Sequence, residues 1–245
     1  MVSIIDELLE SLREDCPVRS VLVGAHCTAV CGRRCGLAST VTGDAPHDWE
    51  PVRDVGRLHL KSARELAEYA RSENPLEASI GVAAINSLLP FDEPRTVEIN
   101  ALDVLARHGR GKTVALVGHF PFVPMLRRAV GALWVIEQRP AEGDHPASAA
   151  AELIARADVI GLTGSALINH TLDALLSFCR PDAFVVVLGP STPVSALLFE
   201  HGAAVLAVAH VTDETIALQA IGQGASFRGV PGVRLLALAR PGAAV

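Results

Sequence analysis

Residues 158–176 read DVIGLTGSALINHTLDALL and place a strand, a turn and a helix in direct succession. The mainly apolar residues 158–162 predict a buried strand, and Thr163-Gly164-Ser165 predicts the turn that ends it. The apolar residues that follow recur at helical spacing, so a helix is expected to continue from the turn. At the carboxyl end of a buried parallel strand, the free N–H groups of such a helix attract a ligand. A helix capped by Thr163 or Ser165, with no ligand, is the simpler alternative.

Strand-like and helix-like segments alternate regularly after residue 100. The expected strands are 113–118, 132–137, 158–163, 183–189, 204–209 and 233–239, and the expected helices are 121–130, 147–157, 165–178, 193–201 and 212–222. This alternation is typical of parallel sheets, because each crossover between parallel strands needs a helix. We therefore predict a Rossmann-like α/β domain over residues 93–245, with a doubly wound, mainly parallel sheet.

The first 92 residues lack this regular alternation and predict a smaller α+β domain. We expect helices over 2–14, 62–71 and 75–89, strands over 18–30 and 35–43, and an exposed loop over 44–58. Pro90 and the polar stretch that follows it, residues 91–100 with Pro94, separate this part from the regular alternation. The predicted boundary between the domains 1–92 and 93–245 lies in that stretch.

The composition excludes several classes of protein. Of the 245 residues, 50% are hydrophobic and only 20% are charged, which indicates a compact globular chain. A net charge of −6 with no basic cluster argues against nucleic acid as a partner. No apolar run reaches the roughly 18 to 20 residues that membrane insertion requires, and the acidic amino terminus does not resemble a signal peptide. We therefore expect a cytoplasmic protein; whether it forms a homo-oligomer stays open.

Polar side chains and glycines gather at four expected strand ends. In a doubly wound sheet, ligands bind outside the carboxyl ends of the strands. We therefore predict a site for a small ligand or metal ion at one rim of the sheet. Its candidate residues are Asn86 from the first domain and His119, Glu137, Thr163, Gly164, Ser165, Asn169, Gly189, Ser191 and Thr192 from the second.

The first of these strand ends argues against a dinucleotide cofactor. Glu137 follows Gly118 by 19 residues, at a position where dinucleotide-binding folds place a ribose-binding acid. However, residues 118–124 read GHFPFVP, with bulky side chains where a pyrophosphate needs glycines. Neither NAD nor FAD is therefore expected. A nucleoside-type ligand without a pyrophosphate, such as S-adenosylmethionine, stays open.

A cysteine cluster near the amino terminus is a second candidate for metal binding. Cys27, Cys31 and Cys35 follow His26 within ten residues, and thiolates suit transition metal ions such as zinc or copper(I). Their spacing matches no strong metal-binding pattern, so a cysteine-rich strand and turn without a metal is the alternative. Two arginines between the second and third thiols are expected to lower the pKa of these thiols. The odd total of five cysteines favours reduced thiols.

Several segments together resemble the putative heavy-metal chelation family, a domain of unknown function. They are GVAAINSLL (81–89), VGHFPF (117–122), IEQRP (136–140), ADVIGLTGSALINHTLDALL (157–176) and LGPSTPVSALLFEHG (188–202). The resemblance implies a Rossmann-like domain preceded by an enolase amino-terminal-like domain, with a site in the cleft between them. It also implies a role in handling metals or metallated cofactors. His170 departs from the pattern, because a small residue is expected there.

Two functional hypotheses follow, and a purely structural role is the third possibility, which leaves the four polar strand ends unexplained. The first is a metal-binding or metal-chelate-binding protein of metal homeostasis or metallocofactor metabolism, which uses Asn86, His119 and Glu137. His119 and the three clustered cysteines are the candidate metal ligands. The alternative is an enzyme that acts on a small anionic or nucleoside-like metabolite at the carboxyl ends of the strands. In that enzyme His119 would be the acid–base catalyst, and Glu137, the other candidate catalytic residue, would orient the substrate.

Overall fold

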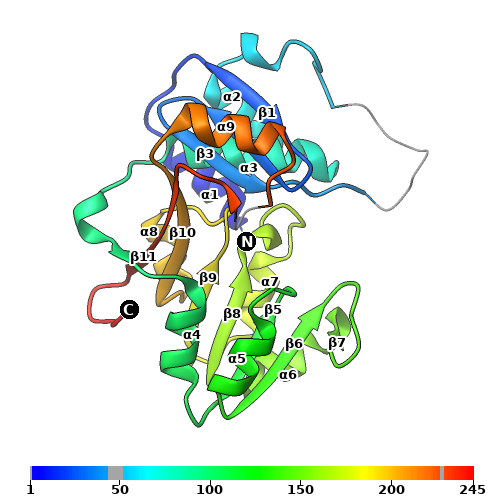
Figure 1. Cartoon of the computed structure of the whole chain (residues 1–245), viewed down its shortest axis with the longest axis vertical. Helices are drawn as coiled ribbons and strands as arrows, with labels where there is room; N and C mark the ends of the chain where they lie inside the picture. Colours follow the sequence, from blue (N-terminus) through cyan, green and yellow to red (C-terminus); the bar gives the residue numbers. More distant parts are fainter. Residues whose placement is uncertain (1, 44–51, 227–228) are drawn as a thin grey trace.

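A computed structural model describes residues 2–43, 52–226 and 229–245 of the chain and contains two sheets (Figure 1). Only part of the expected loop 44–58 falls within these residues. The smaller sheet has three antiparallel strands in the order β1-β2-β3, and the larger has eight strands in the order β4-β11-β10-β9-β8-β5-β6-β7. Within the described residues, no helix has the length and apolar character needed to cross a membrane.

The smaller sheet and its helices come from the amino-terminal part of the chain. The elements are α1 (Ile4–Ser11), β1 (Ser20–Val23), β2 (Cys27–Cys31), β3 (Cys35–Ser39), η1 (Leu58–Leu60), α2 (Ala63–Ala67), η2 (Glu68–Arg71) and α3 (Pro75–Leu88). The prediction of one strand over 18–30 was wrong. Gly24 donates its N–H to the Cys27 carbonyl at 3.0 Å, and this turn divides the stretch into a hairpin.

The larger sheet contains all six strands expected after residue 100, each within two residues of its expected bounds. The strands are β4 (Val97–Glu98), β5 (Thr113–Val117), β6 (Ala132–Glu137), β7 (His145–Pro146), β8 (Val159–Thr163), β9 (Phe184–Leu188), β10 (Val205–Val211) and β11 (Val233–Ala239). The six strands from β10 to β7 in the sheet order pair in parallel. At the other edge, β11 pairs antiparallel with β10, and β4 pairs antiparallel with β11.

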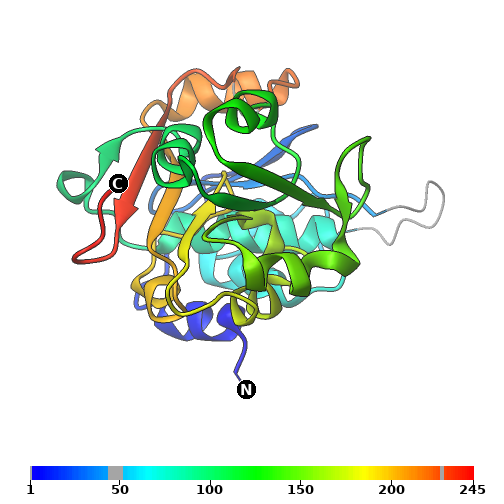
Figure 2. The ribbon, with the colours of Figure 1, turned by 90° about the horizontal axis from the view of Figure 1, so that it is seen from below.

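Helices cover both faces of the larger sheet, as a doubly wound fold requires (Figure 2). The elements are η3 (Glu93–Arg95), α4 (Ala101–Gly109), α5 (Val123–Ala129), η4 (Ala147–Ala149), α6 (Ala150–Arg156), η5 (Gly164–Ala166), α7 (Leu172–Ser177), α8 (Ala196–Glu200) and α9 (Glu214–Gly222). Helices α4 and α5 cover one face, and α6, α7 and α8 cover the other. The prediction of a continuous helix over 165–178 was wrong. His170 adopts a φ of +54°, which interrupts helical geometry between η5 and α7.

The order of the strands creates a switch point between β5 and β8. The chain leaves β5 to form β6 on one side, and β8 later pairs on the other side of β5. Connections that leave in opposite directions open a crevice at the carboxyl ends of these two strands. The smaller sheet lies across those ends (Figure 1). The fold therefore covers the crevice with residues from the amino-terminal part of the chain.

Strands β2 and β3 of the smaller sheet are buried on both faces. Alternate residues of β2 and β3, including Ala29 and Leu37, pack with Ala217 and Ile221 of α9, which is drawn in orange in front of the sheet in Figure 1. The opposite face belongs to the main core, which also contains most of α3. Every residue of β2 is accordingly buried. Helices far apart in the sequence, α3 and α9, thus cover the two faces of one small sheet.

Helix α3 packs unusually close to its neighbours. Its first turn is well defined, because Asn74 caps it and Pro75 occupies its first position. A Cβ placed on Gly81 would lie 1.9 Å from the Ala70 backbone nitrogen, whereas any real Cβ stays beyond about 3 Å. A Cβ on Gly36 of β3 would lie 2.2 Å from the Ala83 carbonyl oxygen of this helix. These two glycines therefore permit the backbone contacts that fix α3 between η2 and β3.

We expect Gly81→Ala to lower the free energy of unfolding by at least about 2 kcal/mol, because the backbones of α3 and η2 must separate. Gly222→Ala is the matched control. A Cβ at this last residue of α9 meets only the Leu22 side chain, at 3.8 Å. The control should be neutral or stabilise the protein by up to about 1 kcal/mol. Urea denaturation measures both, and equal stability of the two variants would contradict the packing argument.

A stack of three side chains joins the segment after α3 to the larger sheet. The Phe91 ring lies parallel to the His210 ring of β10, with centroids 4.1 Å apart. The Arg34 guanidinium lies 5.1 Å from the Phe91 centroid and donates to the carbonyls of Asn86 and Leu89. Burial, together with the charge of Arg34, lowers the pKa of His210 below its usual value of 6.5.

This lowered pKa predicts a loss of stability in mild acid. As the pH falls below about 6.5, the unfolded imidazole takes up a proton that the folded one does not, so the free energy of unfolding decreases. His210→Phe keeps a ring against Phe91 and should reduce this dependence. Burial also lowers the pKa of His108, so some dependence should remain. Urea midpoints between about pH 5 and 8 test the difference, and identical slopes would refute it.

Candidate functional site

A cavity of about 480 Å³ lies at the switch point between β5 and β8. Residues at the ends of β5, β6 and β8 and in the segment between η5 and α7 line this cavity. Ser39, at the end of β3, closes it from the amino-terminal part. The structure brings together here five of the predicted site residues: His119, Glu137, Thr163, Ser165 and Asn169.

The loop after β5 turns sharply at Gly118. This residue has a φ of +102°, which favours glycine, and a Cβ there would lie 3.1 Å from the Phe120 ring and 3.2 Å from Thr163. The turn brings His119 out of the strand and into the lining of the cavity. Gly118, which was expected at this strand end, therefore permits the sharp backbone turn and the close approach of Thr163.

A buried carboxylate orients the His119 ring. His119 Nδ1 lies 2.7 Å from Asp144 Oδ2, and the Asp144 side chain is only 2% exposed, whereas that of His119 is 43% exposed. The same carboxylate oxygen accepts the Ala141 N–H at 3.1 Å. In a neutral imidazole this arrangement places the proton on Nδ1 and leaves Nε2 with its lone pair. The pair can therefore offer one oriented nitrogen to a ligand or a metal ion.

Sequence reasoning missed Asp144. It lies in the loop between β6 and β7, after Gly143, which has a φ of +85°. No motif spacing links it to His119. The turn residues around Gly143 were the only signal, and they indicate a loop, not a partner for His119.

Glu137 binds two backbone N–H groups beside the cavity. Its Oε2 accepts the His119 N–H at 2.8 Å, and its Oε1 accepts the Gln138 N–H at 2.7 Å. Both oxygens therefore hold backbone donors. Glu137 therefore fixes the loop that carries His119 and also lines the cavity.

A chain of hydrogen bonds runs from the cavity into the contact between the two sheets. Thr163 Oγ1 donates to Ser165 Oγ at 3.3 Å. It also accepts the Ser165 N–H and so caps the start of η5. Ser165 Oγ donates to Ser39 Oγ at 3.1 Å, and the Ser39 N–H donates to Ser191 Oγ at 2.8 Å. Ser39 thus connects the loops that follow β8 and β9.

Three predicted ligand-binding residues lie in this contact and not in the cavity. Ser191 is fully buried, and Thr192 and Asn86 are nearly so. Asn86 Nδ2 donates to the Leu37 carbonyl at 2.9 Å and to the Pro190 carbonyl at 3.4 Å. The chain after β9 brings Ser191 against the end of β3, and Asn86 reaches the same contact from α3. They line neither this cavity nor the one described next.

The predicted Gly164 also belongs to this contact. It is buried, and a Cβ there would lie 2.7 Å from both the nitrogen and Oγ1 of Thr192. The turn after β8 therefore packs directly on the loop after β9. Gly164 makes that close packing possible.

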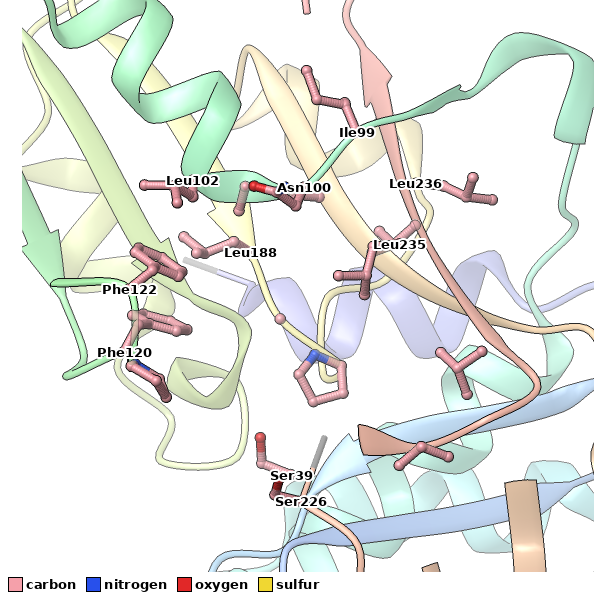
Figure 3. A pocket seen from close by; sticks show the side chains of 18 of the residues that line it. Ser39, Ile99, Asn100, Leu102, Phe120, Phe122, Leu188, Ser226, Leu235 and Leu236 are labelled. Atoms are coloured by element: carbon pink, nitrogen blue, oxygen red, sulfur yellow. The ribbon is translucent and has the colours of Figure 1, made fainter. Parts of the chain in front are cut away.

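A second cavity, of about 720 Å³, adjoins the first (Figure 3). The two cavities share Ser39 and Phe120 in their linings. The larger one extends from the predicted Gly189, which has a φ of +110°, toward β11 and the start of α4. Its walls are mostly apolar, in contrast to the hydroxyl and amide groups of the smaller cavity. The predicted rim is therefore divided into a polar part and an apolar part.

The three clustered thiols lie inside the smaller sheet. Cys31 and Cys35 face each other across β2 and β3, with their sulfur atoms 2.8 Å apart. The hydrogen bond with Cys35, together with burial, raises the pKa of Cys31, and burial raises the pKa of Cys27 to about 12. The expectation that these thiols would have lowered pKa values was wrong for both residues.

The neighbouring arginines do not act on the thiols because they have other partners. Arg33 pairs with Glu14 at 2.6 Å, and Arg34 donates to backbone carbonyls near the end of α3. Within the described ranges, no three His, Cys, Asp or Glu side chains are grouped so that they could hold a metal ion. The structure thus does not bring His119 and the thiols together.

Comparisons with known proteins cover both parts of the chain. A DUF364 family model, described as putative heavy-metal chelation, matches residues 100–239. A DUF4213 model with the same description matches residues 5–89. No curated protein matches the chain.

Two solved structures are similar over almost the whole chain. A DUF364 family protein of unknown function from Desulfitobacterium hafniense is 25% identical, with 97% of this chain and 98% of that chain covered and a TM-score of 0.82. A DUF364 family protein of unknown function from Pyrococcus horikoshii is 21% identical, with the same coverage and a TM-score of 0.81. These structures share the fold described above.

The hydrogen bond from Ser39 to Ser191 predicts a stability effect. Ser191→Ala leaves the Ser39 N–H without its acceptor in a buried contact, so we expect a loss of about 1 to 3 kcal/mol in the free energy of unfolding. Ser177→Ala is the control, because the exposed Ser177 hydroxyl bonds only within its own helix. It should change stability by no more than about 0.5 kcal/mol. Thermal and urea denaturation measure both, and a neutral Ser191→Ala would contradict the role of this bond.

Proposed function

The chain belongs to the putative heavy-metal chelation family, and on this premise we propose that it binds a metal chelate in the smaller cavity. The proposed ligand is a transition metal ion already held by an organic molecule. His119 would contribute one coordinating nitrogen. Residues 93–245 would supply this metal contact as one domain, and residues 1–92 would cover the site as another.

The His119–Asp144 pair carries this proposal. Histidines that bind metals usually donate their other ring N–H to a carboxylate or carbonyl, which fixes the ring and makes the ligating nitrogen more basic. Asp144 is placed in this way behind His119, at 2.7 Å.

The shortage of further protein ligands favours a chelate over a bare ion. Protein sites for transition metals commonly use three or four side-chain ligands. The described part of the chain offers no such group. In the proposal, the organic molecule supplies the remaining donor atoms, and His119 fills a position that the chelate leaves open.

The other polar residues of the cavity suit the organic part of such a ligand. Thr163, Ser165, Asn169 and Ser39 place hydroxyl and amide groups around the space beside His119. These groups can hydrogen-bond the carboxylates or carbonyls that chelating molecules carry. We propose that this recognition serves metal homeostasis or metallocofactor metabolism.

The same pair supports a second candidate, an enzyme that acts on a small anionic or nucleoside-like metabolite. A histidine oriented by a carboxylate can accept or donate a proton near neutral pH. In this candidate the chemistry would need no metal, and the hydroxyls of Thr163 and Ser165 would hold the substrate.

Metal retention tests the first candidate. Protein stripped with a chelator is titrated with nickel, cobalt, zinc and iron(II), each as the free ion and as its nitrilotriacetate chelate, followed by desalting and metal analysis. We expect wild-type protein to retain a chelate more tightly than the free ion. His119→Ala should weaken retention at least about tenfold, and Asp144→Asn by about 10- to 100-fold. His59→Ala, at an exposed position outside both cavities, is the control and should match wild type.

Two outcomes would count against the first candidate. One is failure of wild-type protein to retain any of these species, and the other is equal retention by His119→Ala. Thermal stabilisation by a metabolite without metal, lost in Ser165→Ala, would favour the second candidate instead.

A further inference from the structure

The larger cavity has no role in the metal contact proposed above. Its volume of about 720 Å³ falls in the range of small-molecule sites, which are roughly 300 to 1,000 Å³ and mainly apolar. Its walls come from the loop after β5, from β9, β10 and β11, and from the start of α4. Leu102, Leu188 and Leu235 line it together with two phenylalanines (Figure 3).

The two phenylalanines give one side of the cavity an aromatic wall. The rings of Phe120 and Phe122 lie parallel, with centroids 5.0 Å apart and planes 12° apart. Figure 3 shows both rings on the same side of the cavity, opposite Leu235. Aromatic rings favour contact with other aromatic groups, in offset-stacked or edge-to-face arrangements.

Large apolar side chains at the cavity remain exposed. Met125 is 49% exposed and Leu235 is 37% exposed, although both line the cavity. Exposed apolar surface that is gathered at one concave site usually marks a place of binding. Polar groups are few there, and the Asn100 side chain is already engaged in capping α4. The cavity therefore suits an apolar group that needs few hydrogen bonds.

The two cavities adjoin at Phe120 and Ser39. Phe120 directly follows His119, so one loop presents an imidazole to the smaller cavity and an aromatic ring to the larger. A single elongated molecule can therefore contact His119 at one end and the phenylalanine wall at the other. Binding both ends of one molecule gives more affinity than binding either end alone.

We infer that the larger cavity binds the flat, apolar part of the same organic ligand whose metal-binding end lies at His119. The ligand class is thus an aromatic or polycyclic metal chelator. This inference rests on the proposed function. The cavity assignment has a separate test, because the apolar part can be measured without a metal.

The first measurement uses anthracene carboxylate, a flat fluorescent probe, with metal-free protein. Leu235→Glu and Met125→Glu place a charge in the apolar lining at exposed positions, so they should weaken probe binding at least about tenfold without unfolding the protein. Leu60→Glu, at a side chain that is 73% exposed and lines neither cavity, should bind like wild type. His119→Ala should also keep the probe, and circular dichroism confirms that each variant is folded.

The second measurement compares two nickel chelates, of phenanthroline and of nitrilotriacetate. Only the phenanthroline chelate carries a flat aromatic body. We expect wild-type protein to bind it at least about tenfold more tightly than the nitrilotriacetate chelate, which corresponds to about 1.4 kcal/mol. That preference should disappear in Leu235→Glu, and binding of both chelates should weaken in His119→Ala.

The possible failures are distinguishable. If wild-type protein does not bind the metal-free probe, or if Leu235→Glu binds it as well as wild type does, the cavity assignment is wrong whatever the metals do. If the probe binds as expected but neither nickel chelate does, the proposed metal function fails and the inference of a shared ligand fails with it. If both chelates bind equally tightly, the two cavities do not hold one molecule.

Discussion

The contact of Ser39 with the loops after β8 and β9 is the constraint on which the site depends. Ser39 accepts from Ser165 and donates its N–H to Ser191, so the end of one small strand is fixed against the carboxyl ends of two parallel strands. Both cavities are bounded by this serine. Without the contact, the switch point would be an open edge of the sheet. With it, the crevice becomes a site that is walled on several sides, with a polar part and an apolar part.

Much of the larger sheet could be predicted, because buried parallel strands leave continuous apolar runs between helical segments. The sequence could not show the direction of the last strand. An apolar run such as that of β11 looks the same whether it pairs in parallel or, as here, antiparallel with β10. The break before α7 was also hidden, since it depends on the backbone of one residue, His170, inside an otherwise helical pattern.

The site was predictable where it follows from topology. His119, Glu137, Thr163, Ser165 and Asn169 meet because the carboxyl ends of neighbouring parallel strands share one edge. Side-chain roles were harder to predict, since they depend on loops and on the smaller sheet. Asp144, the partner of His119, lies in an irregular loop. The hydroxyl of Ser191 faces the smaller sheet. The residues that line the apolar cavity form no recognisable sequence motif.

The burial of the smaller sheet between α3 and α9 has a consequence for the order of folding. Its first strand begins at Ser20, but the helix that covers its outer face ends at Gly222. During synthesis, the apolar residues of that face therefore stay uncovered by α9 until the chain has been made as far as residue 222. A fragment that stops before α9 would keep them in contact with water and would be prone to aggregate.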